Sequence, residues 1–169
     1  MITIRKAREE DGELLTEIGM RAWRKAMASV GEATEMAANA RDAFARFAAD
    51  GWLTIMIVEA SGVAVGWAAR EDMDETITDF WIDPDFEGQG FGTALLAAVE
   101  EGIKAQGFSV ARLQTHAMNS DALKFFRKHG YTVNWLTVTY NPKLDRDVQS
   151  VGLSKSLAEA NRAGYGQEF

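Results

Sequence analysis

The chain has 169 residues and a formal net charge of −7, and 47% of its residues are hydrophobic. This size and composition predict one globular domain with its own core, and the negative charge argues against general nucleic-acid binding, which needs a basic surface. The sequence has no apolar run near the ~18–20 residues of a membrane span and no apolar secretory segment at its start, so we expect a cytoplasmic protein that does not bind membranes.

The first half of the chain alternates between strand and helix patterns. Residues 8–29 have helical spacing of apolar positions, and Asp11 is the expected N-cap. Two apolar runs joined at Ser61 and Gly62 predict a β-hairpin. The predicted elements are a strand over 1–7, helices over 8–29 and 32–50, a hairpin over 52–70 and a strand over 75–84, which Pro84 ends.

The second half begins with a glycine-rich turn and an Ala/Leu-rich helix that runs to Gln106, with Gly107 as the expected C-cap. A short helix should begin at Asn119 or Ser120 as cap and end at Gly130. The remaining predicted elements are strands over 108–118, 131–140 and 148–157, with a loop over 141–147.

This order of elements predicts one α/β domain over residues 1–157, followed by a flexible tail over 158–169. We expect a mixed, mostly antiparallel sheet of about seven strands, flanked by about four helices. A βαβ unit should lie in the middle of the chain, where a helix separates two strands.

Three glycines occupy alternate positions, Gly88, Gly90 and Gly92, between a strand and a helix. Without Cβ atoms, successive backbone N–H groups can converge on an anion such as a pyrophosphate, and Thr93 can add a hydroxyl. The other interpretation is a turn that is merely tight. No Lys-Ser/Thr pair follows as in a Walker loop, and the spacing differs from a dinucleotide fingerprint. A pyrophosphate ligand outside these two classes suggests coenzyme A.

The segment "IDPDFEGQGFGTALL" resembles the signature turn of the GNAT superfamily of acetyl-CoA-dependent N-acetyltransferases, Arg/Gln-x-x-Gly-x-Gly/Ala. Two other segments are similar to the same family. "IRKAREEDGELL" resembles its opening strand and helix, and "NSDALKFFRKHGY" resembles its Asn-x-x-Ala-x-x-Phe-Tyr-x-Lys-x-Gly-Phe pattern. The matching pieces occur in the family order and extend over residues 2–135.

The resemblance implies a sheet that opens after the third meander strand, with acetyl-CoA as cosubstrate in the gap. Strand backbone would pair with the pantetheine arm, turn amides would hold the pyrophosphate, and an asparagine would hydrogen-bond the pantetheine. The implied coenzyme-binding residues are Phe80, Trp81, Ile82, Gly88, Gln89, Gly90, Phe91, Gly92, Thr93, Asn119, Phe126 and Lys128.

Two positions depart from the family pattern. The first position of the turn is Glu87, whose carboxylate disfavours a phosphate neighbour unless it points outward or pairs with a base such as Arg127. The family's tyrosine, thought to protonate the departing thiolate, falls on Phe126, which cannot donate a proton. A thiol with a pKa near 8.5 is a tolerable leaving group, so we expect a slower enzyme or a substitute donor, with Tyr131 and Tyr140 as candidates.

An acyl acceptor must attack as a neutral amine. At pH 7, deprotonation costs a lysine-like amine about 4.6 kcal/mol and an α-amine about 1.4 kcal/mol. The candidate bases are Asp79 and His116, which flank the place where the central strands would part. Each has a structural alternative: a solvent-facing or acceptor-anchoring residue for Asp79, and a hydrogen-bonded strand histidine for His116. His129 is expected to interact with the C-terminal end of its helix.

The leading hypothesis is an N-acetyltransferase that moves acetyl from acetyl-CoA to a primary amine of a small molecule, peptide or protein. The attack would be direct, within a ternary complex, because a chain without cysteine cannot form an acyl-cysteine. The alternatives are a CoA-binding module with weak or lost catalysis and a nucleotide-binding domain. Two histidines and no cysteine predict no metal site. From the resemblance we also expect a homodimer, formed through the last strands.

Overall fold

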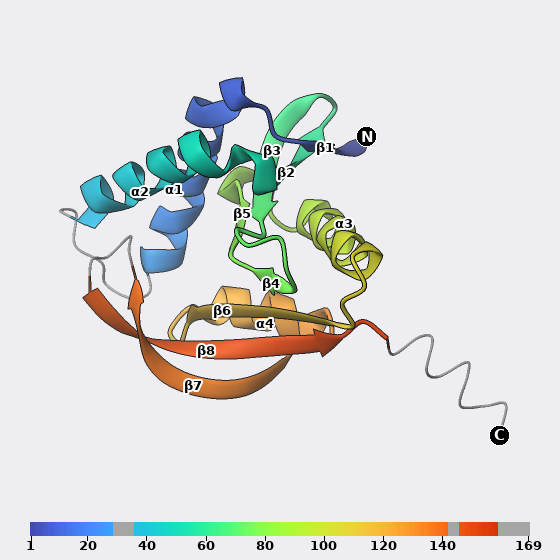
Figure 1. Cartoon of the computed structure of the whole chain (residues 1–169). Coiled ribbons are helices and arrows are strands. Elements are labelled where there is room, and N and C mark those ends of the chain that lie inside the picture. The colour runs from blue at the N-terminus through green and yellow to red at the C-terminus, as the bar shows by residue number, and fades with distance from the viewer. Residues whose placement is uncertain (29–35, 142–145, 159–169) are drawn as a thin grey trace, which may run out of the picture.

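The computed structural model describes residues 1–28, 36–141 and 146–158 (Figure 1). The helices are α1 (Gly12–Ala28), α2 (Met36–Gly51), α3 (Phe91–Ala105) and α4 (Ser120–Lys128). The strands are β1 (Ile2–Lys6), β2 (Ile55–Ala60), β3 (Val63–Ala69), β4 (Thr76–Ile77), β5 (Asp79–Ile82), β6 (Val110–His116), β7 (Thr132–Asn141) and β8 (Arg146–Ser156). Short 3-10 turns are η1 (Glu9–Asp11), η2 (Trp52–Thr54) and η3 (Pro84–Phe86).

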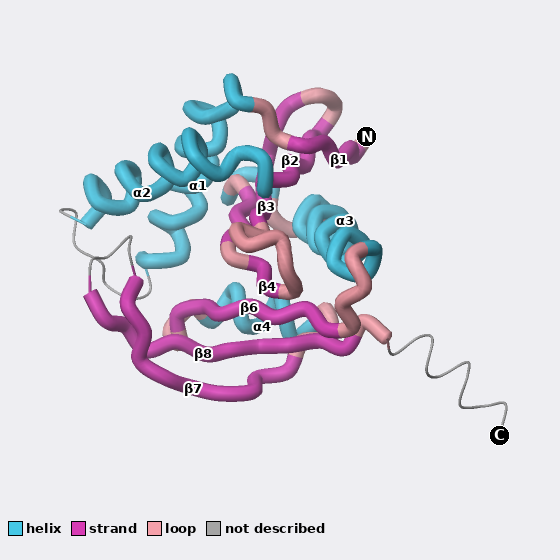
Figure 2. Tube along the Cα trace, viewed as in Figure 1, coloured by secondary structure: helices cyan, strands magenta, loops and turns pink. Residues whose placement is uncertain are grey.

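Within the described ranges, the strands form two four-stranded sheets (Figures 1 and 2). The first sheet, in the order β1-β2-β3-β5, is antiparallel throughout. The second, in the order β4-β6-β8-β7, is antiparallel except for the parallel pair β4–β6. Because α3 lies between β4 and β6 in the chain, these three elements form the central βαβ unit. The predicted mixed, mostly antiparallel α/β fold is confirmed.

The predicted strand over 75–84 is two strands, divided at Thr78. β4 pairs with β6 in the second sheet, whereas β5 pairs with β3 in the first. Thr78 fixes the division, because its backbone N–H and its hydroxyl both donate to the carbonyl oxygen of Ala69, at 2.8 and 3.1 Å. The two sheets therefore part after Thr78, and the division adds one strand to the predicted number.

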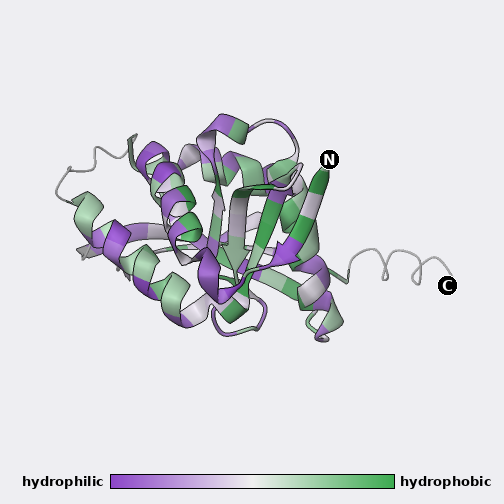
Figure 3. Cartoon of the chain, turned by 90° about the horizontal axis from the view of Figure 1, so that it is seen from above, coloured by the Kyte–Doolittle hydropathy of each residue, from purple (hydrophilic) through white to green (hydrophobic). Residues whose placement is uncertain are grey.

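The first sheet carries a hydrophobic core on each face. Ile57 and Trp67 pack with Phe44 beneath α1 and α2, and Val58 packs with Leu96 beneath α3. Figure 3 shows hydrophobic residues concentrated on the central strands and hydrophilic residues on the outer sides of the helices. None of the helices in the described ranges has both the length and the apolar character to cross a membrane. The sheet is thus held between α1–α2 and α3.

Asp11 does not cap α1 as predicted. It ends the turn η1, is 7% exposed, and accepts hydrogen bonds from the Arg8 backbone N–H at 2.7 Å and the Arg5 guanidinium at 2.9 and 3.1 Å. Arg5 also donates to Glu59 at 2.7 Å. The Arg5 guanidinium holds the pKa of Asp11 below its usual value. The carboxylate of Asp11 is therefore bound by Arg5 of β1 and by the Arg8 backbone, and it does not cap the first amides of α1.

The predicted ends of α3 and α4 are confirmed. Gly107 and Gly130 have φ angles of 94° and 97°, the left-handed conformation common just after a helix. Asn119, rather than Ser120, caps α4 through a hydrogen bond from the Ala122 backbone N–H to its side-chain oxygen, at 3.2 Å. These local signals fix where α4 begins and ends.

β7 is an edge strand of the second sheet and pairs with β8 within the described residues. Most of its large apolar side chains are exposed, between 42% and 63% of their surface: Val133, Trp135, Leu136, Val138 and Tyr140. The predicted loop over 141–147 lies partly outside the described residues, as does the predicted tail from residue 159 onward.

Gly66 is expected to be essential for the close approach of β3 and β5. A Cβ atom there would lie 2.5 Å from Ile82 Cδ1 and 2.9 Å from the backbone oxygen of Trp81. We expect Gly66→Ala to lower the free energy of unfolding by about 1–3 kcal/mol, measured by urea denaturation. Gly12→Ala is the matched control, because its Cβ would meet no atom within 4 Å and the residue already has helical angles. Equal stability of the two variants would contradict the packing of these strands.

Candidate functional site

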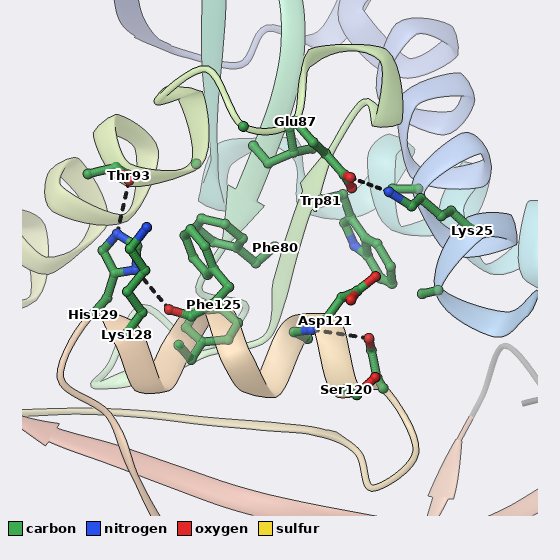
Figure 4. Close-up of a pocket in the computed structure, with 18 of the residues that line it drawn as sticks. Lys25, Phe80, Trp81, Glu87, Thr93, Ser120, Asp121, Phe125, Lys128 and His129 are labelled. Carbon is green, nitrogen blue, oxygen red and sulfur yellow. Dashed lines mark hydrogen bonds and ion pairs between the residues drawn. The ribbon is translucent and has the colours of Figure 1, made fainter. Parts of the chain in front are cut away.

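A cavity of about 830 Å³ opens between β5, the glycine turn, α1 and α4 (Figure 4). It lies where the two sheets part, beside the edge of β5 that pairs with no other strand in the described ranges. Most of the predicted coenzyme-binding residues line it together: Phe80, Trp81, Ile82, Gly88, Gly90, Gly92, Thr93, Asn119, Phe126 and Lys128.

The glycine turn presents bare backbone to this cavity. Gly88 and Gly90 have φ angles of 74° and 91°, and a Cβ at either position would meet no protein atom within 4 Å. These two glycines are therefore required by the left-handed backbone and leave open space beside it. Gly92 differs, because it lies in α3 and a Cβ there would approach the Phe125 ring at 3.2 Å.

The first turn of α3 has N–H groups without acceptors inside the helix. Gly90 is its N-cap and has no side chain to cap it, and the first helical bond runs from the Ala94 N–H to the Gly90 carbonyl at 3.0 Å. The N–H groups at the start of the helix, which precede this bond, can therefore serve a ligand. Together with the positive end of the helix, they form a site suited to a phosphate or carboxylate.

Residues at both ends of α4 reach the cavity. Asn119 uses its side-chain oxygen to cap the helix, so its amide N–H groups are the part that can serve a ligand. At the other end, His129 Nδ1 lies 2.8 Å from the Phe125 carbonyl oxygen and Nε2 lies 2.9 Å from the Thr93 hydroxyl. Because a carbonyl oxygen only accepts, Nδ1 carries the hydrogen of that bond, and Nε2 pairs with the Thr93 hydroxyl. His129 thus connects the end of α4 to the start of α3.

Glu87 pairs with Lys25 of α1, not with Arg127 as the sequence suggested. Both side chains line the cavity, and Figure 4 shows Lys25 reaching from α1 to the turn. The hydrogen bond to Glu87 raises the pKa of Lys25, and the charge of Asp121 acts in the same direction. The glycine turn therefore carries a neutralised carboxylate.

Phenyl rings form the wall of the cavity opposite the turn. The Phe80 centroid lies 5.6 Å from that of Phe125 and 5.4 Å from that of Phe126. Phe126 is 5% exposed and has no group that could donate a proton. Tyr131 is 2% exposed and donates its hydroxyl to Glu100 at 2.7 Å, which removes it as a substitute donor. Burial is the main cause of its raised pKa.

Four predicted site residues do not line the cavity. Gln89 is exposed, and Phe91 is 8% exposed and packs against Phe86. Asp79 accepts a hydrogen bond from the indole N–H of Trp81 at 3.0 Å. His116 Nδ1 accepts from the Met118 backbone N–H at 3.0 Å, and burial lowers the pKa of its imidazole. Asp79 is therefore connected to the cavity through the ring of Trp81.

The predicted coenzyme-binding residues include none on α1 and only some of those on α4 that line the cavity. The lining residues concerned are Ala22, Lys25, Ala26, Ala28, Ser120, Asp121, Ala122, Phe125 and His129. The residues on α4 belong to the segment that carried the family resemblance, so that segment was the available signal. For α1 the only local signal was a row of small residues at helical spacing, which also suits plain packing.

The sequence model of the Acetyltransferase (GNAT) family matches residues 17–131, a span that includes every lining residue of the cavity. An uncharacterized N-acetyltransferase of Methanocaldococcus jannaschii, MJ1207, is 30% identical over 84 residues, which cover 44% of this chain and 37% of that protein.

Solved structures that share the fold include the two that follow. A GCN5-related N-acetyltransferase of Rhodopseudomonas palustris is 26% identical with a TM-score of 0.76, over 92% of this chain and 95% of that one. The PaiA N-acetyltransferase of Thermoplasma acidophilum, solved in complex with coenzyme A, is 20% identical with a TM-score of 0.77, over 92% and 99%.

Proposed function

Because this chain belongs to the acetyltransferase (GNAT) family, we propose that it transfers the acetyl group of acetyl-CoA to a primary amine. The observation that carries the proposal is the cavity of about 830 Å³, which the glycines of the turn and the residues of β5 line together. The coenzyme A complex of the similar PaiA N-acetyltransferase supports the same cosubstrate.

The coenzyme is proposed to follow the cavity from the turn to α4. Amides between Gly88 and Thr93 would hold the diphosphate, since Gly88 and Gly90 border open space and the positive end of α3 follows them. The pantetheine arm would extend along the edge of β5 and receive a hydrogen bond from the Asn119 amide. Lys128 lines the same cavity and adds a positive charge.

Acetyl transfer is proposed to proceed by direct attack in a ternary complex. Without cysteine, the chain cannot form an acyl-cysteine. The family's tyrosine is replaced by Phe126, whose ring contacts are apolar. A CoA-like thiol has a pKa near 8.5, so its thiolate can depart without a protein acid, at a cost of up to the ~10²–10⁴-fold that general acid catalysis contributes.

Asp79 is the proposed general base. It lies at the start of β5, next to Phe80 of the cavity, and the Trp81 indole orients its carboxylate. His116 is less suited, because Nδ1 already accepts the Met118 N–H, so in the neutral ring Nε2 carries the hydrogen and has no lone pair. The acceptor would be an amine of a small molecule, peptide or protein.

The alternative function is a CoA-binding module with weak or lost catalysis. The replacement of the tyrosine by Phe126 and the carboxylate of Glu87 at the turn both favour it. A binding module and an enzyme would use the same coenzyme site, so measuring CoA binding alone does not distinguish the two functions.

A homodimer through β7 is proposed as the assembly. All ten residues of this edge strand, TVNWLTVTYN, are uncharged, and its large apolar side chains are exposed. Natural edge strands are usually protected by charges, proline or a covering segment. Antiparallel pairing of β7 with its copy would satisfy the outer backbone groups and the twofold symmetry of most dimers.

The first expected result is release of the CoA thiol when the protein meets acetyl-CoA and a suitable amine from a panel of peptides, polyamines and small amines. CoA should also raise the free energy of unfolding, by about 2.7 kcal/mol at a hundredfold excess over Kd. Gly90→Val should abolish this stabilisation, because a branched side chain blocks the turn.

Gly107→Val is the matched control, since Gly107 has a similar φ of 94° and open space but does not line the cavity. Unchanged CoA binding by Gly90→Val would contradict the site. Stabilisation by CoA without thiol release would favour the binding module, and stabilisation by ATP or NAD instead would favour a nucleotide-binding domain.

Asp79→Asn should lower the acetylation rate at pH 7 by about 10²–10⁴-fold for a lysine-like acceptor. The difference in rate between the variant and wild type should become smaller as the pH rises toward the pKa of the amine, because the acceptor then loses its proton to solvent. Initial rates from pH 6 to 10 measure this, with His116→Gln as the control that keeps the wild-type profile. Identical profiles for Asp79→Asn and wild type would remove Asp79 as the base.

Light scattering after gel filtration should give the mass of a dimer, and Leu136→Lys with Val138→Lys should give a monomer, because like charges would then face each other across the twofold axis. Leu53→Lys, at a position 76% exposed outside β7, is the control and should leave the dimer intact. A monomeric wild type would refute the assembly.

A further inference from the structure

The glycine turn holds a negative charge where the proposed ligand is itself negative. Glu87 directly precedes Gly88 and lines the cavity. A carboxylate beside a diphosphate repels it, and the neighbouring Asp121 adds a second carboxylate to the same lining. Amides and a helix end would have to overcome this repulsion unless a cation offset it.

Lys25 is placed to offset that charge. Its Nζ forms an ion pair with Glu87 Oε1, from a helix 62 residues earlier in the chain. Lys25 itself lines the cavity together with Ala22 and Ala26 of the same helix. Figure 4 shows Lys25 between the turn above and Asp121 of α4 below. The ammonium is thus within the part of the cavity that meets the turn.

The fold does not depend on this ion pair. Both side chains are about half exposed, at 48% and 45%, and exposed pairs contribute little to stability. α1 is already held by buried Trp23 and by Arg21, which pairs with the 5% exposed Asp83 at 3.0 Å. A pair that adds little to the fold and lies on the cavity wall is better explained by the ligand.

We propose that Lys25 is a coenzyme-binding residue, which neutralises Glu87 and provides the positive charge that the first position of the turn lacks. This inference rests on the proposed function and deepens it. On binding, Lys25 would move its ammonium toward the diphosphate while it still screens Glu87. α1 would then be part of the coenzyme site, and the glycine turn alone would not form the complete site.

Calorimetric Kd values for CoA test the proposal with Lys25→Gln, Glu87→Gln and the double variant. Lys25→Gln should weaken CoA binding by about tenfold, because it leaves Glu87 unpaired against the diphosphate. Glu87→Gln should bind CoA as tightly as wild type or more tightly. The double variant, which has the same net charge as wild type, should lie within about threefold of it. Pantetheine, which lacks the diphosphate, should bind wild type and Lys25→Gln alike.

The matched control is Arg41→Gln, which breaks an exposed pair with Glu17 between α2 and α1. It should leave the Kd for CoA unchanged. If Glu87→Gln weakens CoA binding as much as Lys25→Gln does, the pair is only a mechanical link and the proposal is wrong. If Lys25→Gln binds CoA like wild type, the proposal is also wrong while the coenzyme site stands. A wild type that does not bind CoA refutes the proposed function together with the inference.

Discussion

The site depends on the two hydrogen bonds from Thr78 to the Ala69 carbonyl, because they decide where one run of chain leaves one sheet for another. Before Thr78 the run pairs with β6, and after it with β3. The edge of β5 that faces the second sheet is therefore without a neighbouring strand in the described part of the chain. Backbone polar groups need partners, and here the space beside them is a cavity walled by Phe125 and Phe126. An extended ligand with amide groups suits such an edge.

The position of the glycine turn follows from how β5 ends. Pro84 begins η3, and the Asp83 side chain accepts from the Asp85 N–H at 3.0 Å, so the chain turns sharply out of the sheet. Arg21 of α1 contacts Asp83 at 3.0 Å and Asp85 at 2.6 Å. The turn, the start of α3 and the end of α1 are thereby brought to the same end of the cavity as the free edge of β5.

Local signals were sufficient for the element order and the βαβ unit, and the family resemblance supplied most of the predicted residues that line the cavity. Glycine at the ends of α3 and α4 and the asparagine at the start of α4 act within a few residues, so the sequence pattern indicates them directly. Asp11, Thr78 and Glu87 behaved differently, since their partners Arg5, Ala69 and Lys25 lie in other elements. Because such contacts join elements that only the folded chain brings together, the spacing of residues along the sequence does not predict them.

Contacts between distant elements also decide what the departures from the family pattern at Glu87 and Phe126 mean for the site. A backbone-built anion site tolerates many side chains at its margin, provided that their charge is balanced somewhere within a few ångströms. At Glu87 the balance comes from another helix, so the carboxylate alone is poor grounds for inferring weak binding. Phe126 has no such compensation in its surroundings, because its ring neighbours Phe80 and Phe125 are apolar and the nearby Tyr131 hydroxyl is committed to Glu100. In the proposed function, the two departures from the family pattern therefore bear on different steps: Glu87 on coenzyme binding, where Lys25 offsets its charge, and Phe126 on thiolate departure, where the chemistry of the thiol itself must suffice.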